Sequence, residues 1–120
     1  MSLYPERLLD HFNNPRHSGV LAPPALVVQV ENHACGDILK LSVRLEGGRV
    51  VEAAFQVRGC TASIAAGSAL TEWLHCRSIE DLRSFRETII DEALGGLPSA
   101  SRHAALLCAS AVKALLARVP

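Results

Sequence analysis

Two cysteines in this chain lie in sequence surroundings that favour a role as metal ligands. Cys35 is followed by Gly36 and Asp37, and side chains two residues apart on extended backbone point the same way, so the thiol and the carboxylate can share a target. Cys60 follows Gly59 and precedes a segment of helical texture, where the positive end of the helix dipole stabilises a thiolate. Thiolates and carboxylates both bind zinc and iron. These residues therefore predict a metal site.

The segments between these residues predict an antiparallel sheet. Apolar residues alternate with polar ones over 39–45 and again over 51–57, which is typical of strands with one buried face. The turn between them, Glu46–Arg49, contains two glycines and suits a tight hairpin. An earlier alternating stretch, Leu26 to Val30, adds a third strand. We expect a three-stranded antiparallel sheet.

Helical patterns precede and follow the predicted strands in the sequence. An N-terminal helix is predicted over Leu3 to Phe12, and a helix without alternation or proline over Thr61 to Leu74. Ser78–Asp81 has the residues of a helix start, and a further helix is expected over Ala104 to Ala117. Strands followed by helices predict an α+β fold, with an N-terminal helix and a C-terminal helical half packed against the sheet.

The predicted hairpin should bring the reactive side chains together. Its two arms are nearly equal in length, so the entry to one strand and the exit from the other meet at one edge. Cys35, Asp37 and Cys60 are therefore expected to be neighbours, and His103, at the start of the last helix, offers an imidazole as a fourth ligand. The competing interpretation is structural, since a free cysteine is often a core residue.

Composition narrows the classes of protein that the chain can belong to. Its 120 residues suit one domain over residues 1–120, and Lys+Arg equals Asp+Glu at 12 each, which argues against nucleic acid as a partner. No apolar run reaches the roughly 20 residues that span a bilayer, and no signal peptide is recognisable. We therefore expect no membrane association, a cytoplasmic location and four cysteines that are thiols rather than disulfides.

Several stretches of the sequence match one family, in the same order. They are Asp10-His11, Asn14-Pro15-Arg16, Ala34-Cys35-Gly36-Asp37, Gly59-Cys60-Thr61-Ala62-Ser63-Ile64-Ala65 and Thr71-Glu72-Trp73. Together they resemble the iron–sulfur cluster assembly scaffold family, the IscU-like branch of the NifU N-terminal domain. The similarity runs over nearly the whole chain. The lack of an insertion between the Trp73 helix and the last helix favours this branch over the zinc-dependent sulfur-transfer branch.

The resemblance implies a function and assigns roles to the site residues. Scaffolds of this family receive sulfur from a cysteine desulfurase, assemble a transient [2Fe–2S] cluster and pass it to apo iron–sulfur acceptor proteins. By resemblance, Cys35 and Cys60 would be cluster and sulfur ligands, Asp37 the carboxylate that keeps the cluster labile, and His103 a conditional ligand. The expected function is that of an iron–sulfur cluster assembly scaffold, and not of an enzyme.

The chain departs from the family at its third cysteine. The family has a His-Cys pair at the start of the last helix, whereas this chain has His103-Ala104, and alanine offers no lone pair to a metal. His33, two residues before Cys35, is one candidate replacement, because extended backbone would point both side chains the same way. Cys108, one helical turn after Ala104, is a second, with core packing as the alternative interpretation.

A second departure concerns chaperones. The family's Leu-Pro-Pro-Val-Lys motif, which Hsp70/J-type chaperones recognise, is Leu97-Pro98-Ser99-Ala100-Ser101 in this chain. The altered motif argues against such chaperones as partners.

Two alternative functions remain open. Two thiolates, a carboxylate and an imidazole also form a complete tetrahedral set for Zn²⁺, so the chain could be a zinc-binding module or regulatory paralogue that docks on the desulfurase without building clusters. Cys60, His103 and Asp37 also match the residue types of a cysteine-nucleophile enzyme. The sequence identifies no substrate site or oxyanion hole, which ranks this last alternative lowest.

Overall fold

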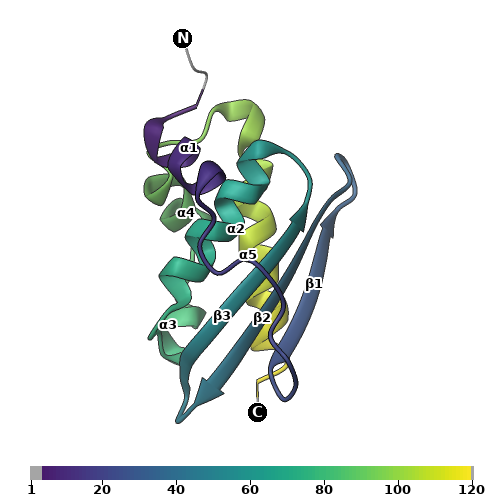
Figure 1. Cartoon of the computed structure of the whole chain (residues 1–120), viewed down its shortest axis with the longest axis vertical. Helices are drawn as coiled ribbons and strands as arrows, with labels where there is room; N and C mark the ends of the chain where they lie inside the picture. The colour runs from purple at the N-terminus through teal and green to yellow at the C-terminus, as the bar shows by residue number, and fades with distance from the viewer. Residues whose placement is uncertain (1–3, 120) are drawn as a thin grey trace.

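The computed structural model describes residues 4–119 and has an α+β fold, as the sequence predicts (Figure 1). Three antiparallel strands form one sheet in the order β1-β2-β3. The elements are α1 Glu6–Asn13, β1 Leu26–Asn32, β2 Asp37–Glu46, β3 Arg49–Arg58, α2 Thr61–Leu74, α3 Ile79–Arg83, α4 Glu87–Ala93, a 3₁₀ turn Ser99–Ser101 and α5 His103–Leu116. The described part of the chain contains no helix long and apolar enough to cross a membrane.

The observed elements differ from the predicted ones mainly at helix bounds. Helix α1 begins at Glu6 and not at Tyr4 or Pro5; Leu3, the predicted start, lies outside the described residues. The last helix begins at His103 rather than Ala104, and α4 was not predicted. A seven-residue helix such as α4 is too short for its apolar period to stand out in the sequence.

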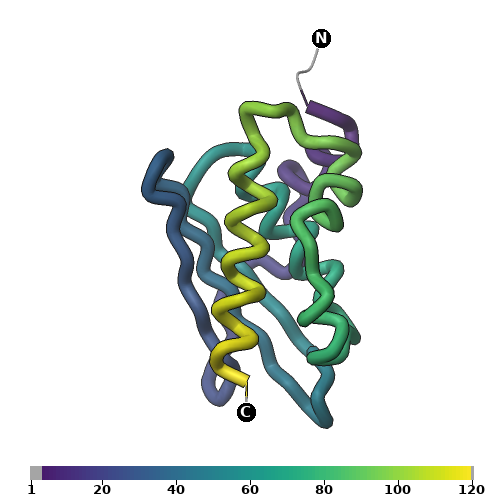
Figure 2. The backbone as a smooth tube through the Cα atoms, turned by 180° about the vertical axis from the view of Figure 1, so that it is seen from behind, coloured from purple at the N-terminus to yellow at the C-terminus, as the bar shows by residue number. Residues whose placement is uncertain are grey.

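Helices α2 and α5 cover one face of the sheet (Figure 2). The strands turn Leu39, Leu41 and Phe55 toward these helices, and each of the three side chains is almost fully buried. Helix α2 approaches the sheet closely at Gly67, where a Cβ atom would lie 2.4 Å from the Phe55 ring. Burial of side chains of this size contributes about 1.5–3 kcal/mol each, so this layer is the main source of stability.

A β-bulge changes the register of the hairpin. The pairing of β2 with β3 shifts between Arg44 and Leu45, where Leu45 pairs with Val50. Val50 is consequently buried, whereas Val51 is half-buried. Val50 takes the core position in place of the predicted Val51 because the bulge adds one residue to β3. Ala53 and Phe55 are buried as predicted, and Ala54 is buried as well.

Residues 14–25 cross the opposite face of the sheet (Figure 1). The Gly19 amide donates to the Phe55 carbonyl at 2.8 Å, and the Phe55 amide donates to the His17 carbonyl at 3.0 Å. Farther on, the Leu21 amide donates to Ser42 Oγ at 3.0 Å. The two bonds to Phe55 cover part of the outer edge of β3, which would otherwise be available for pairing with another chain.

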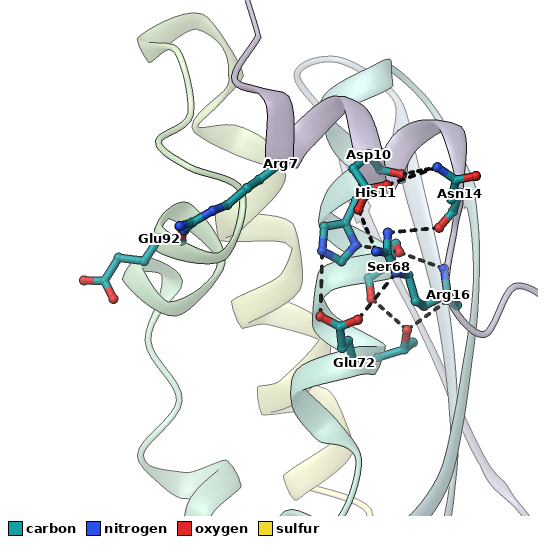
Figure 3. A network of polar contacts seen from close by, with 9 residues as sticks. Arg7, Asp10, His11, Asn14, Arg16, Ser68, Glu72 and Glu92 are labelled. Atoms are coloured by element: carbon teal, nitrogen blue, oxygen red, sulfur yellow. Dashed lines mark hydrogen bonds and ion pairs between the residues drawn. The ribbon is translucent and has the colours of Figure 1, made fainter.

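A buried polar network joins α1 and the following segment to α2 (Figure 3). His11 Nδ1 lies 2.8 Å from Ser68 Oγ, and the Arg16 amide donates to the same oxygen at 2.8 Å. The Arg16 guanidinium pairs with Asp10 at 2.6 Å and with Glu72 at 3.4 Å. Ser68 is therefore the point at which the N-terminal region is attached to the helical layer.

Protonation of His11 should weaken this attachment. Burial lowers the pKa of His11 because the charged ring loses its water, and the charge of Arg16 lowers it further; the charges of Glu72 and Asp10 raise it by less. The unfolded chain, with a histidine pKa of about 6.5, then binds the proton at a higher pH than the folded chain. Stability must therefore fall as the pH decreases through this region.

We predict that the free energy of unfolding decreases as the pH is lowered from 7.5 to 5.5, with a limit of about 1.4 kcal/mol per pH unit from this one proton. Urea titrations followed by circular dichroism at several pH values would measure the slope. His11→Asn should flatten it, because the side chain no longer titrates. His75→Asn, which removes an exposed imidazole, is the matched control. An unchanged slope in His11→Asn would contradict the assignment to His11.

Candidate metal centre

Three connections of the chain meet at one end of the sheet (Figure 1). The β1–β2 turn carries Cys35, the β3–α2 junction carries Cys60, and α5 begins with His103. Ile38 pairs with Arg58 across the hairpin, and this register brings Asp37 beside the residues that follow β3. The arrangement results from the nearly equal arms of the hairpin, as the sequence indicates.

The donor atoms of the four predicted residues converge at this end. Ligand atoms of Cys35, Asp37 and His103 all lie within 4.8 Å of one another. Cys60 Sγ adjoins the same group, 3.4 Å from Asp37 Oδ2 and 3.5 Å from His103 Nε2. His103 Nε2 lies 3.4 Å from Asp37 Oδ2. Asp37 and His103 thus lie close to both thiols. The prediction that Asp37 and Cys60 are neighbours is confirmed.

Asp37 is the most enclosed member of this group, with 5% of its surface exposed. Its carboxylate lies against the backbone of Gly59, where a Cβ atom would be 2.6 Å from Asp37 Cγ, so only glycine fits there without displacement. Ser63 Oγ donates a short hydrogen bond to Asp37 Oδ2, and the Cys60 thiol donates to the same oxygen. The carboxylate is therefore held from several sides.

These partners set the charge state of Asp37. Burial by itself would raise the pKa of the carboxyl group. The hydrogen bonds from Ser63 and Cys60, and then the charge of His103, outweigh burial and hold the pKa below its ordinary value. At neutral pH the site accordingly contains a carboxylate, which can bind a metal ion without first losing a proton.

The two site thiols differ in their access to solvent. Cys35 is exposed, in a turn where Gly36 has a φ of +79° and its amide donates to the Asn32 carbonyl at 2.7 Å. Cys60 is half-buried at the first position before α2, beside Asp37 and the helix that follows. An incoming reagent or protein can therefore reach Cys35 more easily than Cys60.

The two candidate replacements for the missing cysteine do not join this group in the structure. Cys108 is 1% exposed and packs in the core, where burial raises the pKa of its thiol to about 12. The His33 side chain is 89% exposed, with Nδ1 3.6 Å from Glu31 Oε2. Residues 33–36 form a turn rather than extended backbone, so the rule that aligns side chains two apart does not apply to His33 and Cys35.

Ser63 is a residue of the site that the sequence reasoning missed. It lies three residues after Cys60, so one turn of α2 brings the two side chains onto the same face. Ser63 Oγ is 3.3 Å from Cys60 Sγ. The spacing of three residues could have identified Ser63 as a neighbour of Cys60, because Cys60 was predicted to precede a helix. A serine in that position is usually assigned to packing.

We predict a clear order of cysteine modification in the native protein. Iodoacetamide should label Cys35 and Cys76 first, because both are exposed, and Cys60 more slowly. Cys108 should react at least tenfold more slowly than Cys35, since it is buried and its thiol has a raised pKa. Peptide mapping by mass spectrometry would measure the rates, with labelling in urea as the control. Native labelling of Cys108 as fast as Cys35 would contradict its position in the core.

The structure is that of a small α+β protein in which the predicted ligands, two of them cysteines, gather at one end of the sheet. A family model, the NifU-like N terminal domain, matches residues 3–119 of the chain. The iron-sulfur cluster assembly scaffold protein IscU 1 of Archaeoglobus fulgidus is 34% identical over 111 residues, covering 92% of this chain and 72% of that protein. The chain therefore belongs to the NifU-like N-terminal domain family, which confirms the resemblance drawn from its motifs.

One further relative agrees with this assignment, and one solved structure shares the fold. A protein of Drosophila melanogaster named iron-sulfur cluster assembly enzyme IscU is 36% identical over 121 residues, covering 98% of this chain and 78% of that protein. A crystal structure from Fervidobacterium islandicum AW-1, described as an iron-sulfur cluster assembly scaffold protein for the SUF system, has a TM-score of 0.74. It covers 92% of this chain and 94% of its own at 17% identity, which shows a shared fold.

Proposed function

We propose that this protein is an iron–sulfur cluster assembly scaffold, which receives sulfur and iron and transiently holds a [2Fe–2S] cluster for transfer. The observation that carries the proposal is the grouping of the donor atoms of Cys35, Asp37 and His103 within 4.8 Å of one another, with Cys60 Sγ 3.4 Å from Asp37 and 3.5 Å from His103. Membership of the family supports it. Iron and sulfide are cargo in this function, and the residues serve as their temporary ligands.

The chemistry of the donors suits a labile cluster. The two thiolates are soft ligands that bind iron firmly, whereas the carboxylate of Asp37 is a hard ligand with a weaker preference for a sulfide-bridged iron. An imidazole that binds a metal does so in its neutral form, so His103 would add less negative charge to a cluster than a thiolate would. This mixed set would hold a cluster without making its release prohibitively slow.

The four donors would also compensate for the missing third cysteine. Ala104 is completely buried and supplies no ligand. Two sulfurs, one oxygen and one nitrogen nevertheless provide the four protein ligands that a [2Fe–2S] cluster takes. Neither Cys108 nor His33 is required to complete the set, although His33 stays a predicted substitute if the turn that carries it rearranges.

The partners follow from this function. Sulfur would come from a cysteine desulfurase, whose sulfur-bearing group could approach the exposed thiol of Cys35, and the cluster would pass to apo iron–sulfur acceptor proteins. The protein would act in the cytoplasm as a carrier and not as an enzyme. The segment 97–101 departs from the family's chaperone motif, so we do not include Hsp70/J-type chaperones among the partners.

A specific observation favours a second candidate function. The same four side chains form a mixed sulfur, oxygen and nitrogen set of the kind that closes around one Zn²⁺ ion, and Asp37 is buried as in a structural site. The protein would then be a zinc-binding module that docks on the desulfurase without building clusters. The ratio of metal to chain separates the two functions, because a [2Fe–2S] cluster contains two irons and two sulfides.

We predict that anaerobic reconstitution with ferrous iron and sulfide gives a coloured protein with about two irons and two acid-labile sulfides per chain. Cys60→Ser and His103→Ala should lower the iron content at least severalfold, because each removes a ligand. Cys108→Ala and His33→Ala should not, and Cys76→Ser is the control for removing an exposed thiol. Iron and sulfide analysis with visible spectra would measure this. A colourless protein with one bound zinc would instead favour the second candidate.

A further inference from the structure

Ser63 is built into the site by the geometry of α2. It is 2% exposed, and its hydroxyl is in contact with two of the predicted ligands: it donates to Asp37 Oδ2 and lies 3.3 Å from Cys60 Sγ. The hydroxyl makes no other hydrogen bond among residues 4–119. Its only link to another element is therefore the one to Asp37, at the start of β2 and within the site itself.

The surroundings of Asp37 explain why the hydrogen bond from Ser63 is important for the orientation of the carboxylate. On one side, Asp37 Oδ1 lies 2.6 Å from the position that a Cβ atom on Gly59 would occupy. On the other side, Oδ2 is approached by Ser63 Oγ, Cys60 Sγ and His103 Nε2. Of these three, only the Ser63 hydroxyl can keep its hydrogen bond when both the thiol and the imidazole are engaged by a metal.

We infer that Ser63 is a positioning residue of the metal centre, whose hydroxyl holds Asp37 Oδ2 in the orientation that a metal ion requires. This rests on the proposed function, since it assumes that metal binds at Asp37. Oδ2 accepts hydrogen bonds from both the hydroxyl and the Cys60 thiol, so when the thiol loses its proton to bind a metal, the hydroxyl still holds the oxygen in place. Asp37 is thereby ordered before metal arrives, and its side chain loses little further freedom on binding.

The rest of α2 argues against a purely structural role for this hydroxyl. Ser68, one and a half turns later, is also buried, but its oxygen contacts His11 and the Arg16 amide and attaches the N-terminal region. Ser63 reaches another element only through Asp37, which is itself a predicted ligand. Its neighbours Ala62 and Ala65 are buried without any polar group, so an alanine at position 63 would suit the packing of this turn.

The experiment compares metal affinity in the intact chain with and without the hydroxyl. Zn²⁺ affinity would be measured by competition with a chromophoric chelator for wild type, Ser63→Ala and Ser63→Thr. Ser63→Ala should bind Zn²⁺ roughly 10–100-fold more weakly, the usual cost of losing the hydrogen bond that orients a ligand. Ser63→Thr, which keeps the hydroxyl, should recover most of this loss. Thermal unfolding of the metal-free proteins checks that Ser63→Ala still folds.

A double-mutant cycle distinguishes positioning from packing. In an Asp37→Ala background, Ser63→Ala should cause no further loss of Zn²⁺ affinity, because the group that it orients is gone. Co²⁺ absorption adds a second readout: the thiolate-to-metal band should keep its intensity in Ser63→Ala at saturating Co²⁺, while the ligand-field bands shift as the carboxylate moves.

The outcomes separate this inference from the proposed function. If wild type binds neither Zn²⁺ nor Co²⁺, the metal centre itself is wrong. If wild type binds and Ser63→Ala binds within twofold of it, or if the loss is the same with and without Asp37, the positioning role is overturned.

Discussion

A buried carboxylate that needs partners is the constraint around which this end of the molecule is organised. Asp37 begins β2 with 5% of its surface exposed, and burying a charge without compensation is costly. Its partners come from distant parts of the chain: Ser63 and Cys60 lie at the start of α2, and His103 begins α5. Satisfying one carboxylate thus ties the sheet to both helices that cover it.

Helix α2 is attached to two other parts of the molecule through serine side chains. Its first turn presents Ser63 to Asp37, and its middle presents Ser68 to His11 and to the Arg16 amide. Between them, Gly67 lets the helix lie directly on Phe55. A helix fixed at its middle by packing and by the N-terminal region has little freedom at its start, so the thiol of Cys60 is presented in a defined direction.

Ala104 offers no lone pair where the family has a cysteine, so the predicted ligand set has two sulfur donors. In the proposed scaffold, an oxygen and a nitrogen donor would complete the set, and both are harder ligands than a thiolate. Access to the two thiols is also unequal, because Cys35 lies exposed in a turn while Cys60 is half-buried. The proposed function would use the exposed thiol for uptake of its cargo.

Local patterns were sufficient to predict much of this protein. Alternation over 39–45 identified a strand, because the period of two depends only on extended backbone, and the ordered motifs around Cys35 and Cys60 were specific enough to identify the family from the sequence. Equal hairpin arms also brought Asp37 beside Cys60, as expected. The β-bulge after Arg44, which moved Val50 into the core, left no such signal.

The fold class, the family and the residue types of the predicted site could all be inferred from the amino-acid sequence. The contacts between distant residues arise from packing and could not: His103 meets Cys60, across 43 residues of chain, and Ser63 meets Asp37. Helix packing also places the Cys108 side chain in the core. The physical reason is that spacing along the chain sets side-chain direction only within a regular element. Contacts between elements depend on how helices pack on the sheet, which no local pattern records.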